Sequence, residues 1–452
     1  MNGVSLSRWT MSYFAVALAA LILGEALMAA GYGFPSAPLR AAQTLVLVHL
    51  ITVGWLSLLL CGALFQFVPV LVASPLHSDF LPLPTLVFLV AGLTALLAGF
   101  LQLAGTIDLS PALLPFAAMA LATGVGLALY NLGRTLWPVR PLPLPARFVA
   151  IALVCFAVTV ALGAVFSFAF ARPGQLGPLR AVAADGLALH VIAGLGGWLT
   201  FAAMGVSYRL LAMFMLAPEL DGRRPRAAFW VGAGALTATL AGGLLLLFGD
   251  AALLPALVAG GALGVVAIAL YGADMVHLYR ARKRRIIELN SQMAAFALVS
   301  LAAAVVLAAG LIVAGRLSEQ VGALVFLVAF GWLTGLGLAK LYKIVAFLTW
   351  LECYGPVLGK AATPRVQDLV VEARGRKWFV LYYLAVWSAT AALLVPHRVA
   401  FRLAAGAMTI ATLAIASQLV RTRLLSDVTA GSRFPDGAHR PHLLMSTPGS
   451  SG

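Results

Sequence analysis

The chain has 452 residues, of which 62% are hydrophobic and only 10% are charged. Soluble globular domains are about half apolar and about a quarter charged, and a single hydrophobic core stops growing near ~300 residues. This composition therefore excludes a soluble enzyme, a disordered chain and a disulfide scaffold. The apolar runs are long and continuous, unlike the short alternating segments of a membrane β-barrel. The sequence therefore predicts an all-α integral membrane protein.

The formal net charge is +15, from 30 lysines and arginines against 15 aspartates and glutamates. These basic residues form short clusters between the apolar runs, as they do in cytoplasmic loops that face anionic lipid. We therefore expect the positive charge to interact with membrane lipid and not with nucleic acid. The three cysteines, Cys61, Cys155 and Cys353, form no CxxC pair and no CxxCH haem-attachment motif, and they predict no disulfide framework.

Apolar segments long enough to cross a bilayer recur along the chain to about residue 420. A transmembrane helix needs about 20 apolar residues, and clusters of proline and glycine separate the segments that satisfy this rule. We predict a transmembrane domain in residues 1–423, and a disordered cytoplasmic tail in residues 424–452, which are polar and rich in Ser, Gly and Pro. The longest connection, near 351–377, has room for a short surface helix. In chain order the twelve or so predicted spans are 10–32, 43–72, 84–104, 111–134, 148–171, 181–217, 227–249, 252–279, 291–315, 320–350, 378–396 and 398–420.

The distribution of basic residues predicts how these spans are oriented. With the N-terminus inside, 23 lysines and arginines fall on the cytoplasmic side and six on the outer side, while Arg209 lies within a span. This asymmetry follows the positive-inside rule. We therefore expect a multi-pass protein of a bacterial-type inner (plasma) membrane, with both termini cytoplasmic.

The second, sixth and tenth spans share a motif. Gly-Trp-Leu begins at Gly54, Gly197 and Gly331, and each copy has a small, an aromatic and a polar residue eight, eleven and twelve positions after its glycine. Small residues let helices pack closely, and a polar side chain in the last turns can extend to the interface. The residues at these offsets are Gly62, Gly205 and Ala339, then Phe65, Tyr208 and Tyr342, then Gln66, Arg209 and Lys343.

The motif recurs every four spans, which predicts a pseudo-threefold arrangement of four-helix arcs with the second, sixth and tenth spans equivalent. The alternative is coincidence, because glycine, tryptophan and leucine are common in membrane helices. We favour the repeat, since matching offsets on three spans are hard to obtain by chance.

Two of the seven histidines lie inside predicted spans and away from the inner helix ends, His49 in the second and His190 in the sixth. At ~1.5 Å per residue both lie roughly 10–14 Å below the outer surface, and Tyr208 lies five turns below His190 on the same helix face. Neutral imidazole is a common ligand of metals and of haem iron. The pair is therefore a candidate site, with His190 as a metal ligand. The alternative is that each ring hydrogen-bonds a carbonyl or lines a wet crevice.

Other intramembrane polar residues are weaker candidates, because such residues usually face the bundle interior or a cavity. Glu25 lies two-thirds of the way through the first span and is a candidate to relay protons or to pair with a cation. Asp185, near the outer start of the sixth span, and Asp274, near the inner end of the eighth, are expected at the membrane interface. The remaining candidates are Tyr208, Arg209 and Lys343.

The sixth span contains, in order, His190-Val-Ile-Ala-Gly, Trp198-Leu-Thr and Met204-Gly-Val-Ser-Tyr208-Arg209. Together with twelve spans, three related arcs and histidines near the outer ends of two spans, these stretches resemble subunit I of the haem-copper oxidases and nitric-oxide reductases. The sixth helix is most similar to that of the divergent C-type members. The resemblance implies that His190 corresponds to a copper ligand and that His49 stands where the family carries a low-spin haem ligand.

The chain departs from the family in its ligands. The family's seventh helix carries a His-His pair and its tenth helix two haem-ligating histidines, whereas neither span has a histidine here. A complete haem-copper centre cannot be built from that ligand set, so the resemblance does not imply oxygen reduction. In span count and scarcity of ligands the chain is similar to the haem- and copper-containing NnrS proteins linked to nitric-oxide stress.

The sequence favours a membrane protein like cytochrome c oxidase subunit I that binds haem, copper or both, with a role in respiratory or nitric-oxide metabolism. A respiratory complex or a small gaseous ligand is then the expected partner, and enzymatic activity stays open because the catalytic ligands are incomplete. The alternatives are a secondary transporter and a non-catalytic assembly partner. A major-facilitator transporter is disfavoured, because the loop after the second span, ASPLHSDFLPLP, has no Arg or Lys.

Overall fold

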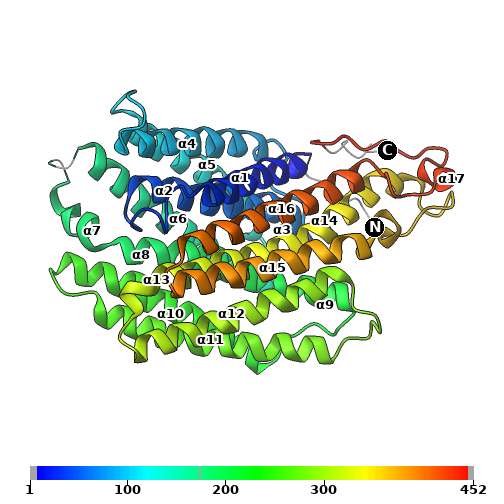
Figure 1. The fold of residues 1–452 in the computed structure, drawn as a ribbon. Helices are drawn as coiled ribbons and strands as arrows, with labels where there is room; N and C mark the ends of the chain where they lie inside the picture. The colour runs from blue at the N-terminus through cyan, green and yellow to red at the C-terminus, as the bar shows by residue number, and fades with distance from the viewer. Residues whose placement is uncertain (1–7, 173, 175, 446–452) are drawn as a thin grey trace. The chain divides into compact units, whose positions relative to one another are not determined.

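The computed structural model describes residues 8–172, 174 and 176–445, and within this part of the chain the regular structure is helical, without a β-strand (Figure 1). Twelve of its helical segments are long and apolar enough to cross a membrane. The prediction of an all-α multi-pass membrane protein is therefore confirmed. The candidate spans are Thr10–Ala30, Ala42–Val72, Pro82–Leu103, Leu113–Leu136, Leu144–Ala171, Leu187–Met215, Arg223–Phe248, Leu254–Arg280, Leu289–Val313, Leu317–Val357, Glu372–Leu394 and Arg398–Arg423.

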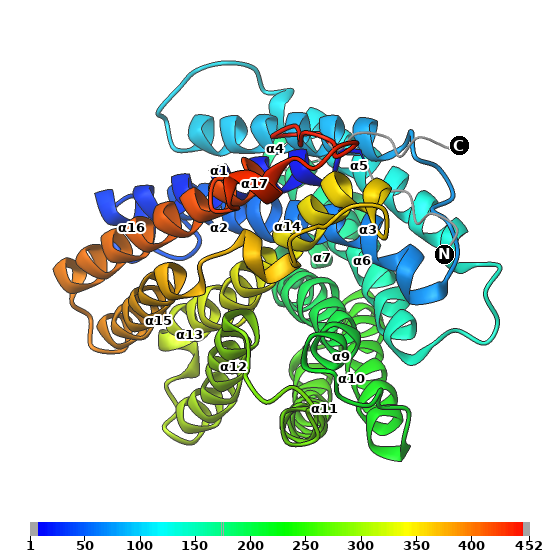
Figure 2. The same ribbon diagram turned by 90° about the vertical axis from the view of Figure 1, so that its right-hand side faces the viewer.

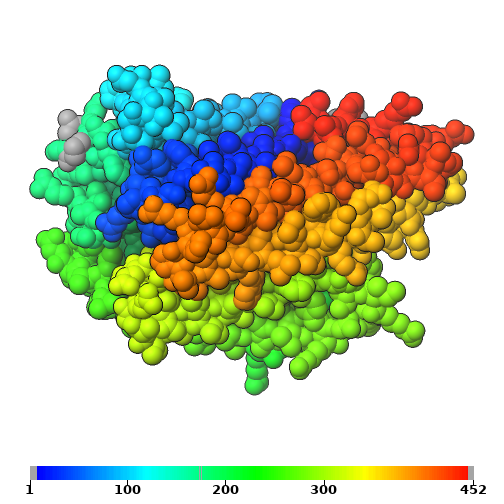
Figure 3. Space-filling view, viewed as in Figure 1, coloured from blue at the N-terminus to red at the C-terminus, as the bar shows by residue number. Residues whose placement is uncertain are grey.

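The chain divides into two compact units, Met1–Gln66 with Ile287–Gly452, and Phe67–Ile286. In the first unit α1 packs along α16 and against η1, and α15 pairs with α16 (Figures 1 and 2). The space-filling view shows the side chains of α15 and α16, in orange, side by side (Figure 3). The elements that lie in this unit or enter it are α1 (Thr10–Ala30), α2 (Ala42–His49), η1 (Leu50–Ser57), α3 (Leu58–Val72), α12 (Leu289–Val313), α13 (Leu317–Phe326), η4 (Leu327–Thr334), α14 (Gly335–Tyr354), η5 (Gly355–Val357), η6 (Val366–Leu369), α15 (Glu372–Leu394), α16 (Arg398–Arg423) and α17 (Ala430–Arg433).

In the second unit α6 packs against α5, η3 and α9, and α4 pairs with α5 and α10 with α11 (Figure 2). These pairs are antiparallel neighbours because their connections are short. The elements of this unit are α4 (Pro82–Leu103), α5 (Leu113–Leu136), α6 (Leu144–Ala171), η2 (Gly177–Leu179), α7 (Arg180–Asp185), α8 (Leu187–Val191), η3 (Ile192–Phe201), α9 (Ala202–Met215), α10 (Arg223–Phe248) and α11 (Leu254–Arg280).

Each copy of the Gly-Trp-Leu motif lies in a π-helix, in which the backbone hydrogen bonds reach five residues back. The three π-helices are η1, η3 and η4. π-helices hold well under ~1% of the residues of ordinary proteins and mostly form single turns, often at functional sites. Three of them at one motif therefore support a true internal repeat and argue against coincidence.

The three sets of four spans also repeat the same pairwise packing. The first helix of each set packs against the π-helix of the second span, as α1 does on η1, α6 on η3 and α12 on η4. The third and fourth spans of each set form a pair, namely α4 with α5, α10 with α11 and α15 with α16. This recurrence of local contacts is what a repeat of four-helix arcs requires.

The motif tryptophans Trp55, Trp198 and Trp332 are the largest fully buried side chains of the described residues. Nε1 of Trp55 donates to Oγ1 of Thr334 at 2.9 Å, which joins η1 to η4. The ring of Trp198 stacks on Phe156 of α6 with 4.0 Å between the ring centroids. The motif therefore packs inside the protein and does not face lipid.

The small residues eight positions after the motif glycines allow a close helix approach. A Cβ atom at Gly62 would lie 2.5 Å from Cβ of Tyr13 on α1, and one at Gly205 would lie 2.5 Å from Cβ of Phe148 on α6. Ala339, at the third equivalent position, is fully buried. Gly62 and Gly205 thus allow the close helix packing that the sequence predicts for these positions.

The sixth span begins later than the predicted range 181–217 and covers Leu187–Met215. The residues before it form the separate short helix α7, which ends before Gly186 and carries the exposed Asp185 at its last position. Hydropathy alone merged the two helices because the residues on both sides of the break are apolar.

The first part of the segment for which the sequence predicts a disordered tail makes specific contacts. Leu425 and Val428 are buried in a cluster with Cys353 and Tyr354 of α14. The Tyr354 hydroxyl also donates to the carbonyl oxygen of Arg433 at 2.9 Å. The connection near 351–377 contains two short 3₁₀-helices, η5 and η6.

Candidate functional site

His49 is the last residue of α2, directly before the π-helix η1. Its ring is half-buried, and Nδ1 lies 2.9 Å from the carbonyl oxygen of Leu45, one turn earlier. Because a carbonyl can only accept, Nδ1 carries the proton. The neutral ring therefore keeps the lone pair on Nε2.

His190 lies in α8, two residues before the π-helix η3. Its Nδ1 lies 3.0 Å from the carbonyl oxygen of Thr159 on α6, and the ring meets Phe166 edge-on with 5.5 Å between centroids. A Cβ atom at Gly163 would lie 3.2 Å from Cε1 of the ring. The half-buried imidazole is therefore held against α6, again with the Nδ1 proton directed at a carbonyl oxygen.

The two histidines do not occupy equivalent positions of the repeat. His49 lies five residues before Gly54, whereas His190 lies seven residues before Gly197. Two residues of helix correspond to about 3 Å of rise and about 200° of rotation. If the spans are related by the repeat, the two rings thus point in different directions, and each is better treated as a separate site.

Among the described residues, no group of three or more His, Cys, Asp or Glu side chains is arranged to hold a metal ion. Haem iron makes a smaller demand on the protein, because the porphyrin supplies the in-plane ligands and one axial histidine is sufficient. A single imidazole such as that of His49 or His190 fits this demand.

Tyr208 belongs to a buried polar triad that the sequence did not predict. Its hydroxyl donates to Oδ2 of Asp274 on α11 at 2.8 Å, and Nε of Arg224 on α10 donates to Oδ1 at 2.5 Å. The ring of Tyr271 meets that of Tyr208 edge-on at 5.6 Å. Asp274, which we expected at the membrane interface, is fully buried, so its charge is balanced inside the unit by Arg224.

The two charged residues of the repeat are both ion-paired. Arg209 pairs with the exposed Glu219, and Nζ of Lys343 lies 2.8 Å from Oε2 of Glu288, just before α12. These contacts hold α9 and α14 to residues of neighbouring connections, which favours a structural role over a catalytic one. Asp185, the remaining acidic candidate near the sixth span, is exposed at the end of α7.

Glu25 on α1 is fully buried, as Asp274 is, but the surroundings of its carboxyl group are different. Neither of its carboxyl oxygens has a hydrogen-bond partner among the described residues. The Thr412 hydroxyl on α16 lies near it but does not complete a hydrogen bond of normal geometry. The sequence identifies Glu25 as a candidate, but it does not predict that the carboxyl group lacks a hydrogen-bond partner.

The sequence also did not predict a buried ion pair between Arg423 and Glu352. Nη1 of Arg423, at the end of α16, donates to Oε2 of Glu352 at 2.8 Å and to Oγ1 of Thr349 at 2.9 Å. The side chains of Arg423 and Glu352 are only 4% and 1% exposed. Both lie at predicted helix ends, where charged residues are ordinary, so the sequence carried no signal of burial.

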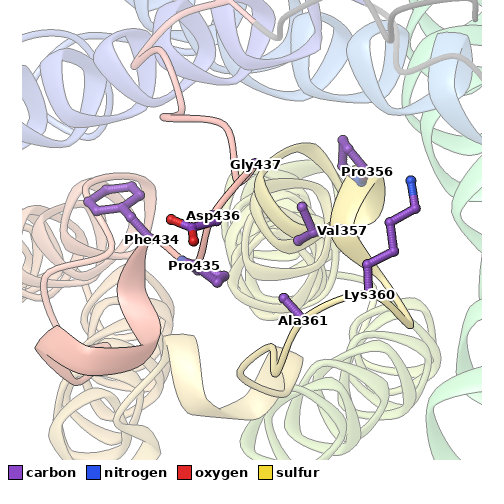
Figure 4. Close-up of a pocket in the computed structure, with 8 residues that line it drawn as sticks. All are labelled: Pro356, Val357, Lys360, Ala361, Phe434, Pro435, Asp436 and Gly437. Atoms are coloured by element: carbon purple, nitrogen blue, oxygen red, sulfur yellow. The ribbon is translucent and has the colours of Figure 1, made fainter.

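A depression with a cavity of about 670 Å³ lies between the loop after α14 and the segment after α17 (Figure 4). Lys360 and Asp436, which both line it, point away from each other (Figure 4). None of the candidate residues in the spans lines this depression. Its lining residues are Pro356, Val357, Lys360, Ala361, Phe434, Pro435, Asp436 and Gly437.

No model of a known protein family matches the chain, and a search of the curated proteins finds no match to it. The functional argument therefore depends on the residues and contacts described above.

Proposed function

We propose that the chain is a haem-binding protein of a bacterial-type inner membrane, similar in architecture to subunit I of the haem-copper oxidases. Its role lies in respiratory or nitric-oxide metabolism rather than in complete oxygen reduction. One observation carries the proposal, namely that the Nδ1 atoms of His49 and His190 lie 2.9 and 3.0 Å from backbone carbonyl oxygens. Histidines that bind metals usually donate their second ring N–H in this way, which orients the ring and leaves Nε2 as the ligand atom.

The chain's own residues would act as axial ligands and as positioning groups. The carbonyl oxygens of Leu45 and Thr159 accept hydrogen bonds from Nδ1–H of His49 and His190. These bonds fix the tautomer of each ring. A haem held by one of these histidines would supply an iron able to bind a small gaseous molecule. Copper at His190, alone or beside haem, is the alternative occupant, and it would need ligands beyond the acidic, Cys and His side chains described.

An optical spectrum and metal analysis of the purified protein, made in cells supplied with haem and copper, test the proposal. We expect a Soret band that is lost or shifted in His49→Ala or His190→Ala, while the variant protein still inserts in the membrane. His439→Ala, in the exposed segment after α17, is the matched control and should keep the full spectrum. A wild-type protein without haem and without copper contradicts the proposal.

A secondary transporter is the second candidate, and the buried carboxyl group of Glu25 is the observation that favours it. Transporters commonly hold an ionisable residue inside the membrane on the path of an ion or proton. A colourless, metal-free protein would favour this function or that of a non-catalytic assembly partner.

The orientation belongs to the same proposal, because the depth of both histidines depends on it. A reporter fused after Arg285 should be cytoplasmic, and one in the 172–180 loop should be periplasmic. Opposite results at both positions would reverse the orientation and remove the argument from the 23-to-6 distribution of basic residues.

A further inference from the structure

Glu25 lies on α1, which packs along α16 and against η1 in the first unit (Figures 1 and 2). Its relative exposure is 0%, and both carboxyl oxygens are buried. Among the described residues it forms no ion pair and no hydrogen bond. The group is therefore shielded from bulk solvent, and no described side chain stabilises a negative charge on it.

Among the described residues, no cation forms an ion pair with this carboxyl group. On α16, Arg402 donates to the carbonyl oxygen of Ala29, one turn away, and is exposed. On α2, the His49 ring bonds to Leu45. On α15, Tyr382 lies within electrostatic reach of Glu25, but a tyrosine is neutral or negative. No neighbouring side chain thus neutralises an ionised Glu25.

The Thr412 hydroxyl lies near Glu25 without completing a hydrogen bond, and other hydroxyl groups of the unit are engaged elsewhere. The Tyr382 hydroxyl donates to the carbonyl oxygen of Phe330 in η4 at 3.0 Å. Oγ1 of Thr334 accepts from Nε1 of Trp55 at 2.9 Å. A bare alkali or alkaline-earth cation needs about six oxygen ligands, and this environment offers few free ones, so a proton is the cation that fits best.

An ionised carboxylate taken out of water without a partner costs several kcal/mol, whereas the neutral acid costs much less. We propose that Glu25 is an intramembrane proton-binding site, occupied by a proton at neutral pH. The proton resides on a carboxyl oxygen of Glu25, and the surrounding helices α1, α15 and α16 with η1 exclude water from it. This site is independent of any cofactor at His49 or His190.

Labelling with the apolar reagent dicyclohexylcarbodiimide tests the proposal, because this reagent attacks protonated carboxyl groups in apolar surroundings. The full-length protein in liposomes is labelled at neutral pH, and the adducts are located by mass spectrometry. We expect an adduct on Glu25, its loss in Glu25→Gln, and none on the ion-paired Asp274 or the exposed Asp185. Suppression of the adduct by Na⁺, relative to choline, would instead identify a metal-cation site and overturn the proposal.

Infrared spectroscopy gives a second measurement that does not depend on access of a reagent. A protonated carboxyl group has a C=O stretching band that a carboxylate lacks. We expect this band in the wild-type protein at neutral pH and its loss in Glu25→Gln, with thermal unfolding showing that the variant remains folded. A wild-type spectrum without a Glu25-dependent band would overturn the proposal whatever the labelling shows.

Discussion

Two buried carboxyl groups, one in each unit, have opposite surroundings. Asp274 is fully buried but receives hydrogen bonds from Tyr208 at 2.8 Å and from Arg224 at 2.5 Å. Glu25 is equally buried and receives none from the described residues. Burial alone therefore does not decide the charge of a carboxyl group. Its partners decide it, and the comparison separates an acidic residue that stabilises the fold from one that is available for function.

The largest effect is expected at Glu352, where both members of the ion pair are buried. Glu352→Ala would leave the guanidinium of Arg423, which is 4% exposed, without its carboxylate. Breaking a buried pair from one side costs about 3–5 kcal/mol. Thermal or denaturant unfolding in detergent measures the loss.

The matched control for Glu352→Ala is Glu319→Ala. Glu319 pairs with Arg316 on the surface, where both side chains are more than half exposed, so its loss should cost at most about 0.5 kcal/mol. Equal losses for the two variants would mean that burial of the Glu352 pair does not matter.

A smaller loss is expected for Asp274→Ala, because Arg224 is 45% exposed and can turn towards water or lipid headgroups. The variant still leaves the buried Tyr208 hydroxyl without its hydrogen-bond acceptor. An unsatisfied buried group lowers the free energy of unfolding by about 1–3 kcal/mol. Tyr208→Phe in the Asp274→Ala background should then recover part of the lost stability. Additive losses in this double-mutant cycle would contradict the coupling.

Much of the fold was predictable, and the reason lies in the apolar runs. The bilayer fixes the length of each span, so hydropathy located all twelve, and the recurrence of Trp55, Trp198 and Trp332 marked the three equivalent ones. The π-helices were not predictable, because one additional residue per turn leaves the hydropathy of a segment unchanged. The break at Gly186 was missed for a similar reason.

The candidate site was predictable in its residues but not in their partners. Asp274 is neutralised by Arg224, which lies 50 residues earlier in the chain, and no local pattern connects them. The different offsets of His49 and His190 from their motif glycines, in contrast, can be read from the sequence alone. Side-chain partners across helices depend on packing, which a single sequence does not specify.

Glu25→Gln should change the stability by less than about 1 kcal/mol, since an amide replaces a neutral acid of almost the same shape and no partner is lost. This small effect contrasts with the larger losses at Glu352 and Asp274. It is measured by the same unfolding experiment. A loss as large as that of Asp274→Ala would mean that Glu25 is ionised and has a partner, and the contrast between the two carboxyl groups would fail.

Asp427 extends the comparison to a carboxyl group beyond α16 and outside the candidate spans, whose own side chain is 9% exposed. Its carboxylate lies 2.6 Å from Arg421 and 2.9 Å from Arg374. Hydrogen bonds from Arg421 and then from Arg374 hold the pKa of Asp427 below its ordinary value of 3.8. The unfolded chain therefore binds a proton at this residue more readily than the folded chain does.

The sign of the pH dependence follows from that lowered pKa. The contribution of Asp427 is fully present above the unfolded pKa near 3.8 and is lost as the pH falls through the lower folded value. Its two arginine partners are about two-fifths exposed, so water and salt screen the pairs and the contribution at neutral pH is at most about 1 kcal/mol. Asp427→Asn should be less stable than the wild type at neutral pH, and the difference should shrink with added salt and vanish under acid. A difference independent of both pH and salt would mean that Asp427 acts through packing and not through its charge.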